Sequence, residues 1–103
     1  MQIIISYSGG YDRSIMIGKK HFDIEMTKPA FLVDAVEDGN MKAAYNELIK
    51  MIRRIYMKAS QFYTLICVVN AKIYRVMFAV DGAEINYEYI DEEGCIETGR
   101  FTA

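Results

Sequence analysis

A long stretch with helical periodicity lies between two segments rich in strand-forming residues, and this order constrains the fold most. From about Met41 to Ser60, apolar side chains recur on one half of a helical wheel, and mostly polar or charged side chains fill the other half. Asn40 stands just before this stretch and can cap the helix N-terminus. Because an apolar half of this kind packs against a core, we expect one long amphipathic helix covering a sheet.

A shorter helix is expected immediately before the long one. Pro29 suits the first turn of a helix, and Gly39 suits a residue just past a helix end. The apolar patch between them consists of Phe31, Leu32, Ala35 and Val36.

The N-terminal segment is typical of short strands. Gln2–Tyr7 and Ser14–Ile17 are rich in β-formers and are separated by a glycine turn. A third strand is indicated by alternation, because apolar residues at Phe22, Ile24 and Met26 are separated by polar ones.

The C-terminal segment is expected to be a meander of four antiparallel strands. The predicted strands are Phe62–Val69, Ile73–Val80, Ile85–Tyr89 and Cys95–Phe101, with a hairpin signal at Asp81-Gly82. Because the first of these runs is almost wholly apolar, we expect it to be a central strand covered on both faces.

The fold class follows from this order of elements. A chain of 103 residues is one domain, and its 52% hydrophobic content is enough to form a core. We therefore expect a single α+β domain spanning residues 1–103. Its antiparallel sheet would combine N-terminal hairpin strands with the C-terminal four-strand meander. The long helix, preceded by the short one, would pack on one face of that sheet.

Composition limits the cellular locations and the classes of partner that we expect for this chain. A formal net charge of −2 gives no global basic footprint for nucleic acid. The apolar runs are far shorter than the roughly 18 residues that a membrane-spanning helix needs. The first residues lack the basic start of a signal peptide, and two cysteines are too few for a disulfide framework. We expect a cytoplasmic protein with reduced thiols and no membrane contact.

One loop invites comparison with nucleotide-binding proteins. Ser8 to Asp12 spell S-G-G-x-D, within the stretch Ser8–Ser14 that follows the first strand. This pattern resembles the loop of the PP-loop ATP pyrophosphatases, and the resemblance implies phosphate binding by backbone N–H groups. The family's pattern continues with Ser or Thr where this chain has Arg13, and the next residues favour a strand over the helix that a phosphate loop needs. We interpret the loop as a turn and keep nucleotide binding as a third alternative.

Residues for catalysis or metal binding are sparse. His21, Asp23 and Glu25 share one face of a predicted strand, but the chain has one histidine in all, and zinc sites use several His or Cys ligands. Cys67 lies in an apolar run, and Cys95 has acidic neighbours that disfavour a thiolate. We therefore expect no metal, no cofactor and no enzymatic activity.

Acidic residues and tyrosines gather in the C-terminal meander. Tyr87 and Tyr89 could provide the centre of an interface, because tyrosine buries area while keeping a polar tip. Carboxylates around them could attract a basic partner. The predicted partner-binding residues are Tyr87, Tyr89, Glu84, Glu88, Asp91, Glu92 and Glu93. Alternation along the strand places the two tyrosines on one face and Glu84 and Glu88 on the other, so one partner could contact both sets only near a hairpin tip or sheet edge.

The polar half of the long helix offers a different surface. It carries a basic stripe that could contact phosphate groups of nucleic acid. The residues of this stripe are Lys42, Lys50, Arg53, Arg54 and Lys58.

Taken together, these features favour a small non-enzymatic binding protein that acts by protein–protein contact. Within that class we expect an inhibitor or regulator of a larger assembly, of the anti-defence type that phages and mobile elements encode, such as an anti-CRISPR protein. The partner would be a protein, for example a nucleic-acid-binding complex with a basic surface, and a homodimer is a further alternative. The alternative function is nucleic-acid binding through the basic stripe.

Overall fold

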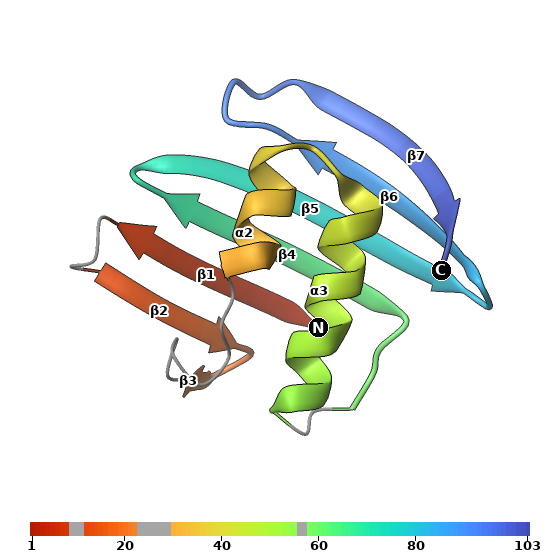
Figure 1. The fold of residues 1–103 in the computed structure, drawn as a ribbon, viewed down its shortest axis with the longest axis horizontal. Helices are drawn as coiled ribbons and strands as arrows, with labels where there is room; N and C mark the ends of the chain where they lie inside the picture. Colours follow the sequence, from red (N-terminus) through yellow and green to blue (C-terminus); the bar gives the residue numbers. More distant parts are fainter. Residues whose placement is uncertain (9–11, 23–29, 56–57) are drawn as a thin grey trace.

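The computed structural model of the chain describes residues 1–8, 12–22, 30–55 and 58–103. Among the described residues, strands come first, then two helices, then strands again (Figure 1), so the predicted α+β class is confirmed. The elements are β1 Gln2–Ser8, β2 Asp12–Ile17, β3 Lys20–Phe22, α2 Ala30–Glu37, α3 Met41–Arg54, β4 Phe62–Val69, β5 Lys72–Asp81, β6 Glu84–Ile90 and β7 Ile96–Thr102.

The strands of the described ranges form one seven-stranded sheet with the order β3-β2-β1-β4-β5-β6-β7. The N-terminal strands therefore continue directly into the C-terminal meander, with β1 and β4 side by side. The meander itself has the predicted strands, each within two residues of the expected bounds. Residues 23–29, which include most of the third predicted strand, lie outside the described residues.

The expectation of a purely antiparallel sheet is wrong at one junction, because β1 and β4 run parallel. Parallel neighbours need a long crossover connection. Here the connection from the N-terminal strands to β4 is the segment of the sequence that contains α2 and α3. It returns the chain to the end of the sheet where β1 begins. There the Met1 amino group donates a hydrogen bond of 2.9 Å to the Phe62 carbonyl, and the Thr64 N–H donates one of 2.9 Å to the Met1 carbonyl.

The long helix begins as predicted and ends earlier than predicted. The side-chain oxygen of Asn40 accepts a hydrogen bond of 3.1 Å from the Ala43 N–H, which is the expected N-cap. The helix ends at Arg54 and does not continue to Ser60. Ser60 instead belongs to the approach to β4, because its N–H donates a hydrogen bond of 2.7 Å to the Tyr63 hydroxyl. The apolar half of the wheel is buried as expected at Met41, Ala44, Tyr45, Leu48, Met51 and Ile52.

The short helix α2 buries most of its predicted apolar patch. Leu32, Ala35 and Val36 are buried, whereas Phe31 points away from the core and is 71% exposed. The helix ends before Gly39, whose φ of +72° is the left-handed conformation that glycine adopts without strain. Pro29 lies outside the described residues.

Both helices pack on the same face of the sheet, as Figure 1 shows. We call the other side the open face. Along β4, buried residues alternate with more exposed ones: Tyr63, Leu65, Cys67 and Val69 contact the helix layer. The prediction that β4 is covered on both faces is therefore wrong for the described residues. The molecule measures 21 Å along its shortest axis, which is the thickness of one sheet and one helix layer.

Candidate protein-binding surfaces

Carboxylates from three separate segments surround one hollow at the end of α2. Two come from the helix end, three from the β6–β7 turn, and one from β7. We call this cluster the acidic end; it comprises Glu37, Asp38, Asp91, Glu92, Glu93 and Glu97. The hollow has a volume of about 360 Å³, and the side chains of Tyr74 and Tyr89 also line it.

Tyr89 holds the acidic end together. Its hydroxyl donates a buried hydrogen bond of 2.6 Å to the Val36 carbonyl, which attaches β6 to the last turn of α2. Burial is the main cause that raises the pKa of Tyr89 to about 12, and the neighbouring Tyr74 and Asp91 add to it. Because the side chain is 6% exposed, it belongs to the core and is not available as the surface contact that the sequence suggested.

The β6–β7 turn is built by Asp91. One oxygen of its carboxylate accepts hydrogen bonds of 2.9 Å from the N–H groups of both Glu93 and Cys95. This Asx-type arrangement fixes the turn and leaves Glu93 exposed at its tip. Glu92 forms an ion pair of 3.3 Å with Lys72 on β5. Among the described residues, no other ion pair involves the acidic end.

The negative charge of the acidic end also raises the pKa values of neighbouring side chains. The pKa of the Lys72 ammonium is raised, chiefly by its hydrogen bond to Glu92. The pKa of the Tyr74 hydroxyl is raised first by burial and then by the charges of Glu92 and Glu37. A cation brought to this surface would therefore meet a negative potential supplied by several carboxylates.

The structure does not bring all of the predicted site residues together. Glu84 and Glu88 lie on the open face, on the opposite side of the sheet from Tyr87. Glu84 forms an ion pair of 3.4 Å with Arg100. Because β7 pairs with β6 along its whole length, β6 is not a sheet edge and one partner cannot reach both faces across it.

Tyr87 is half-buried and packs across β7. Its hydroxyl donates a hydrogen bond of 3.3 Å to Glu97, and burial and this carboxylate raise its pKa. Its ring lies over Gly99, where an added Cβ would come within 2.6 Å of the hydroxyl oxygen. Tyr87 is therefore next to the acidic end, but its side chain packs against β7, the strand that pairs with β6.

Sequence reasoning missed Glu37 and Asp38. They lie more than fifty residues before the β6–β7 turn, and no local pattern links the two segments. The contact depends on the Tyr89–Val36 hydrogen bond, which a sequence pattern does not reveal.

The basic stripe is exposed on the solvent side of α3. Lys42, Lys50, Arg53 and Arg54 belong to this helix, whereas Lys58 follows its end and so leaves the stripe. Lys50 forms an ion pair of 3.2 Å with Glu47. Lys50 and Arg53 border a hollow of about 410 Å³, which also has apolar lining residues such as Ile49.

The Ser8–Ser14 stretch joins two paired strands. Residues 9–11 lie outside the described residues, but Ser8 pairs with Asp12 at the end of the β1–β2 hairpin. The strand β2 stands where a phosphate-binding loop would need a helix, which supports the interpretation as a turn.

Reactive groups are few among the residues that the structure describes. Cys67 and Cys95 are both free thiols, and burial raises the pKa of Cys67 to about 12. No cluster of His, Cys, Asp and Glu suited to a metal ion occurs in the described ranges, although Asp23 and Glu25 fall outside them. Neither α2 nor α3 has the length and apolar character needed to cross a membrane.

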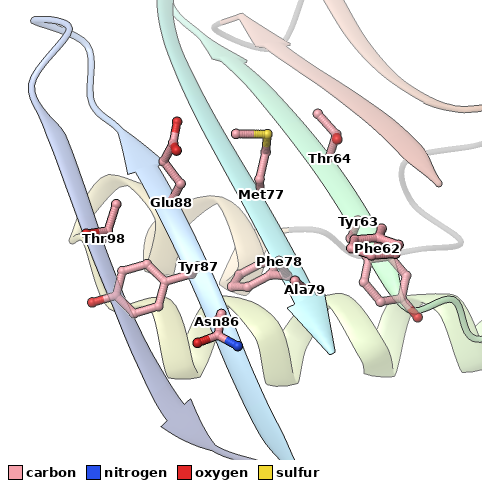
Figure 2. A pocket seen from close by; sticks show the side chains of 10 residues that line it. All are labelled: Phe62, Tyr63, Thr64, Met77, Phe78, Ala79, Asn86, Tyr87, Glu88 and Thr98. Atoms are coloured by element: carbon pink, nitrogen blue, oxygen red, sulfur yellow. The ribbon is translucent and has the colours of Figure 1, made fainter. Parts of the chain in front are cut away.

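The open face has a shallow hollow of its own, of about 270 Å³. Figure 2 shows the side chains that line it, which come from β4, β5, β6 and β7. They include the apolar Phe62 on β4 and the apolar Met77 on β5, and Met77 lies next to the charged Glu88 on β6.

Comparison with known proteins gives no relative: no family model, curated protein or solved structure matches this chain.

Proposed function

We propose that this chain is a non-enzymatic binding protein that regulates or inhibits a larger assembly through its acidic end. The observation that carries this proposal is the convergence of carboxylates from α2, the β6–β7 turn and β7 around one hollow. Like charges repel, so bringing these carboxylates together costs the isolated chain some stability. A basic surface on a partner protein would offset that repulsion and be attracted from a distance.

The chemistry of the acidic end favours charge recognition over apolar burial. Its exposed carboxylates, such as Glu37 and Glu93, can each accept hydrogen bonds from Lys or Arg side chains. Contacts of this kind mainly accelerate association and weaken with added salt, because charges separated by more than about 10 Å are screened at 0.1 M salt.

Within this function we favour an inhibitor of the anti-defence type, such as an anti-CRISPR protein. A compact set of carboxylates can occupy a basic groove that otherwise holds the phosphates of nucleic acid. A cytoplasmic location suits this role and is compatible with two free thiols.

The second candidate is nucleic-acid binding through the basic stripe. It is favoured by the exposed Lys42, Lys50, Arg53 and Arg54 on one helix. Binding of this kind would fall steeply with salt and would require DNA or RNA, whereas the acidic end would bind neither.

Affinity capture from the host, with three baits compared side by side, tests the proposal. The baits are the wild type, Glu37→Lys/Glu93→Lys at the acidic end, and Glu47→Lys/Asp81→Lys as a control with the same change in charge. Glu47 pairs with Lys50 at the surface, and an exposed pair of this kind contributes little stability. We expect a protein that wild type and control capture and the acidic-end variant does not. A partner captured equally by all three, or only in the presence of nucleic acid, would contradict the proposal.

A further inference from the structure

The exposed large hydrophobic side chains of the described residues are concentrated on the open face. Phe62, Ile73, Met77 and Ile96 are between 38% and 66% exposed, and strand alternation places all of them on this side of the sheet. The remaining exposed large hydrophobic side chain is Phe31, on α2. Exposed hydrophobic side chains that gather on one face are typical of interaction sites, so the open face is a candidate interaction surface.

The register of the strands arranges this face as a row that crosses the sheet. Direct cross-strand partners connect Met16, Ile4, Ile66, Arg75, Ile90 and Ile96 from β2 to β7. Every member is apolar except Arg75, which lies on β5. A charged side chain at this point disfavours a wholly apolar partner and demands a carboxylate opposite it.

A carboxylate is available on the same face. Glu88 pairs with Met77, two residues along β5 from Arg75, so the two charged side chains are diagonal neighbours. Within the part of the chain that the structure describes, neither forms an ion pair. Arg75 and Glu88 are therefore adjacent side chains of opposite charge on the open face, with the apolar Met77 and Ile90 next to them.

We propose that the open face binds the open face of a second copy of this chain. In a two-fold symmetric interface, residue i of one copy contacts residue j of the other, and j contacts i. An axis passing between Arg75 and Glu88 in the plane of the interface places the arginine of each copy against the glutamate of its partner. The apolar side chains around them then interdigitate as in a β-sandwich, in which two sheets pack about 10 Å apart.

The size of the face is sufficient for such a dimer. The two longer dimensions of the molecule are 37 and 33 Å, and the sheet extends across this plane. A stable interface buries about 800 Å² on each partner, which is less than this face provides. The helices stay on the outer sides of the dimer, so the acidic end of each copy remains accessible. The dimer thus goes beyond the proposed function and does not depend on it.

The mass of the protein in solution, measured by sedimentation equilibrium, tests the proposal. Each chain has a mass of 11.8 kDa, and we expect twice this value for the wild type. Interfaces of standard size bind with Kd values from micromolar to picomolar, so a wild type that is monomeric at about 100 μM overturns the proposal. Such a monomer would leave the open face to a different protein.

Charge exchange tests which residues form the interface. Arg75→Glu places two glutamates against each other in the dimer, and Glu88→Arg places two arginines against each other. Each variant alone should dimerise at least about 100-fold more weakly than the wild type, as close charge pairs at interfaces do when broken. An equimolar mixture of the two variants should form a heterodimer, because both contacts then join opposite charges. Failure of the mixture to associate overturns the assignment of this pair.

A matched pair of apolar substitutions locates the interface independently of charge. Ile73→Lys lies on the open face and should abolish the dimer, whereas Phe31→Lys removes an even more exposed hydrophobic side chain from the helix layer and should leave the dimer intact. Circular dichroism spectra confirm that both variants are folded. A dimer that survives Ile73→Lys, or is lost in folded Phe31→Lys, places the interface elsewhere.

Discussion

The hydroxyl of Tyr89 donates a hydrogen bond of 2.6 Å to the backbone carbonyl of Val36, across 53 positions of the sequence. Carbonyl groups in the last turn of a helix lack the partner that a continuing helix would supply. The Val36 carbonyl accepts a bond of 3.1 Å from the Gly39 N–H, and Tyr89 adds a second donor from the sheet, which attaches the end of α2 to β6. This bond therefore contributes to the geometry of the acidic end, together with the turn that Asp91 builds.

Replacing this tyrosine should therefore cost stability. We expect Tyr89→Phe to lower the free energy of unfolding by about 1–2 kcal/mol, because a buried hydrogen bond is lost with little change in volume. The control is Tyr87→Phe, which loses a hydroxyl that bonds to Glu97 at the surface and should cost less than about 0.5 kcal/mol. Urea denaturation of both variants measures the difference, and equal losses would contradict the role assigned to Tyr89.

The same residue makes a prediction about alkaline pH. The pKa of Tyr89 rises from 10.0 to about 12 in the folded protein, so the unfolded chain releases this proton more readily. The stability that Tyr89 contributes is complete below pH 10 and is lost as the pH rises toward 12. Cys67, with a pKa raised from 9.0 to about 12, acts in the same direction and begins at lower pH. We expect Tyr89→Phe to lose less stability than the wild type between pH 10 and 12; a parallel decline would contradict this.

Gly99 should resist substitution because of the ring that lies over it. A Cβ at this position would approach the Tyr87 hydroxyl oxygen to 2.6 Å, and Phe101 stands on the same side of the sheet with its ring centroid 6.1 Å from that of Tyr87. We expect Gly99→Ala to destabilise by about 1–3 kcal/mol, the usual cost of overpacking. In a Tyr87→Ala background the same change should cost much less. A double-mutant cycle measures this coupling, and a coupling of zero would show that the two residues act independently.

The β4–β5 hairpin contains a strained alanine. Its two turn residues, Asn70 and Ala71, have φ of 49° and 68°, as a type I′ turn requires. Asn tolerates this conformation, whereas the same conformation destabilises alanine by about 1–2 kcal/mol. We expect Ala71→Gly to stabilise the protein by up to about 1 kcal/mol. Ala83→Gly, in the β5–β6 turn at a residue without positive φ, should instead destabilise by about 0.5–1 kcal/mol. Thermal melting distinguishes the two, and destabilisation by Ala71→Gly would contradict the strain.

Local patterns were sufficient to predict most of the fold. The periodicity of 3.6 residues identified the buried face of α3, and alternation with turn residues identified β4 to β7. What failed depends on contacts between distant segments. The parallel pairing of β1 with β4 arises from where the helical crossover returns the chain, and no residue in either strand encodes that direction.

The candidate site was predicted only in part, again because some of its residues meet through contacts between distant segments. Asp91, Glu92 and Glu93 are adjacent in sequence, so their clustering was visible, whereas Glu37 and Asp38 join them only in three dimensions. Alternation correctly placed Tyr87 and Tyr89 on one face, but it could not show that this face is the one covered by helices.

The rate of association with the captured partner protein tests the central claim most directly. Stopped-flow measurements compare the wild type, Glu37→Lys/Glu93→Lys and the control Glu47→Lys/Asp81→Lys at low and high salt. If the acidic end attracts a basic surface, the acidic-end variant should associate at least about tenfold more slowly at low salt, with a smaller difference at high salt, and the control should match the wild type. Equal association rates for all three proteins at low salt would contradict the claim that the acidic end is the binding surface.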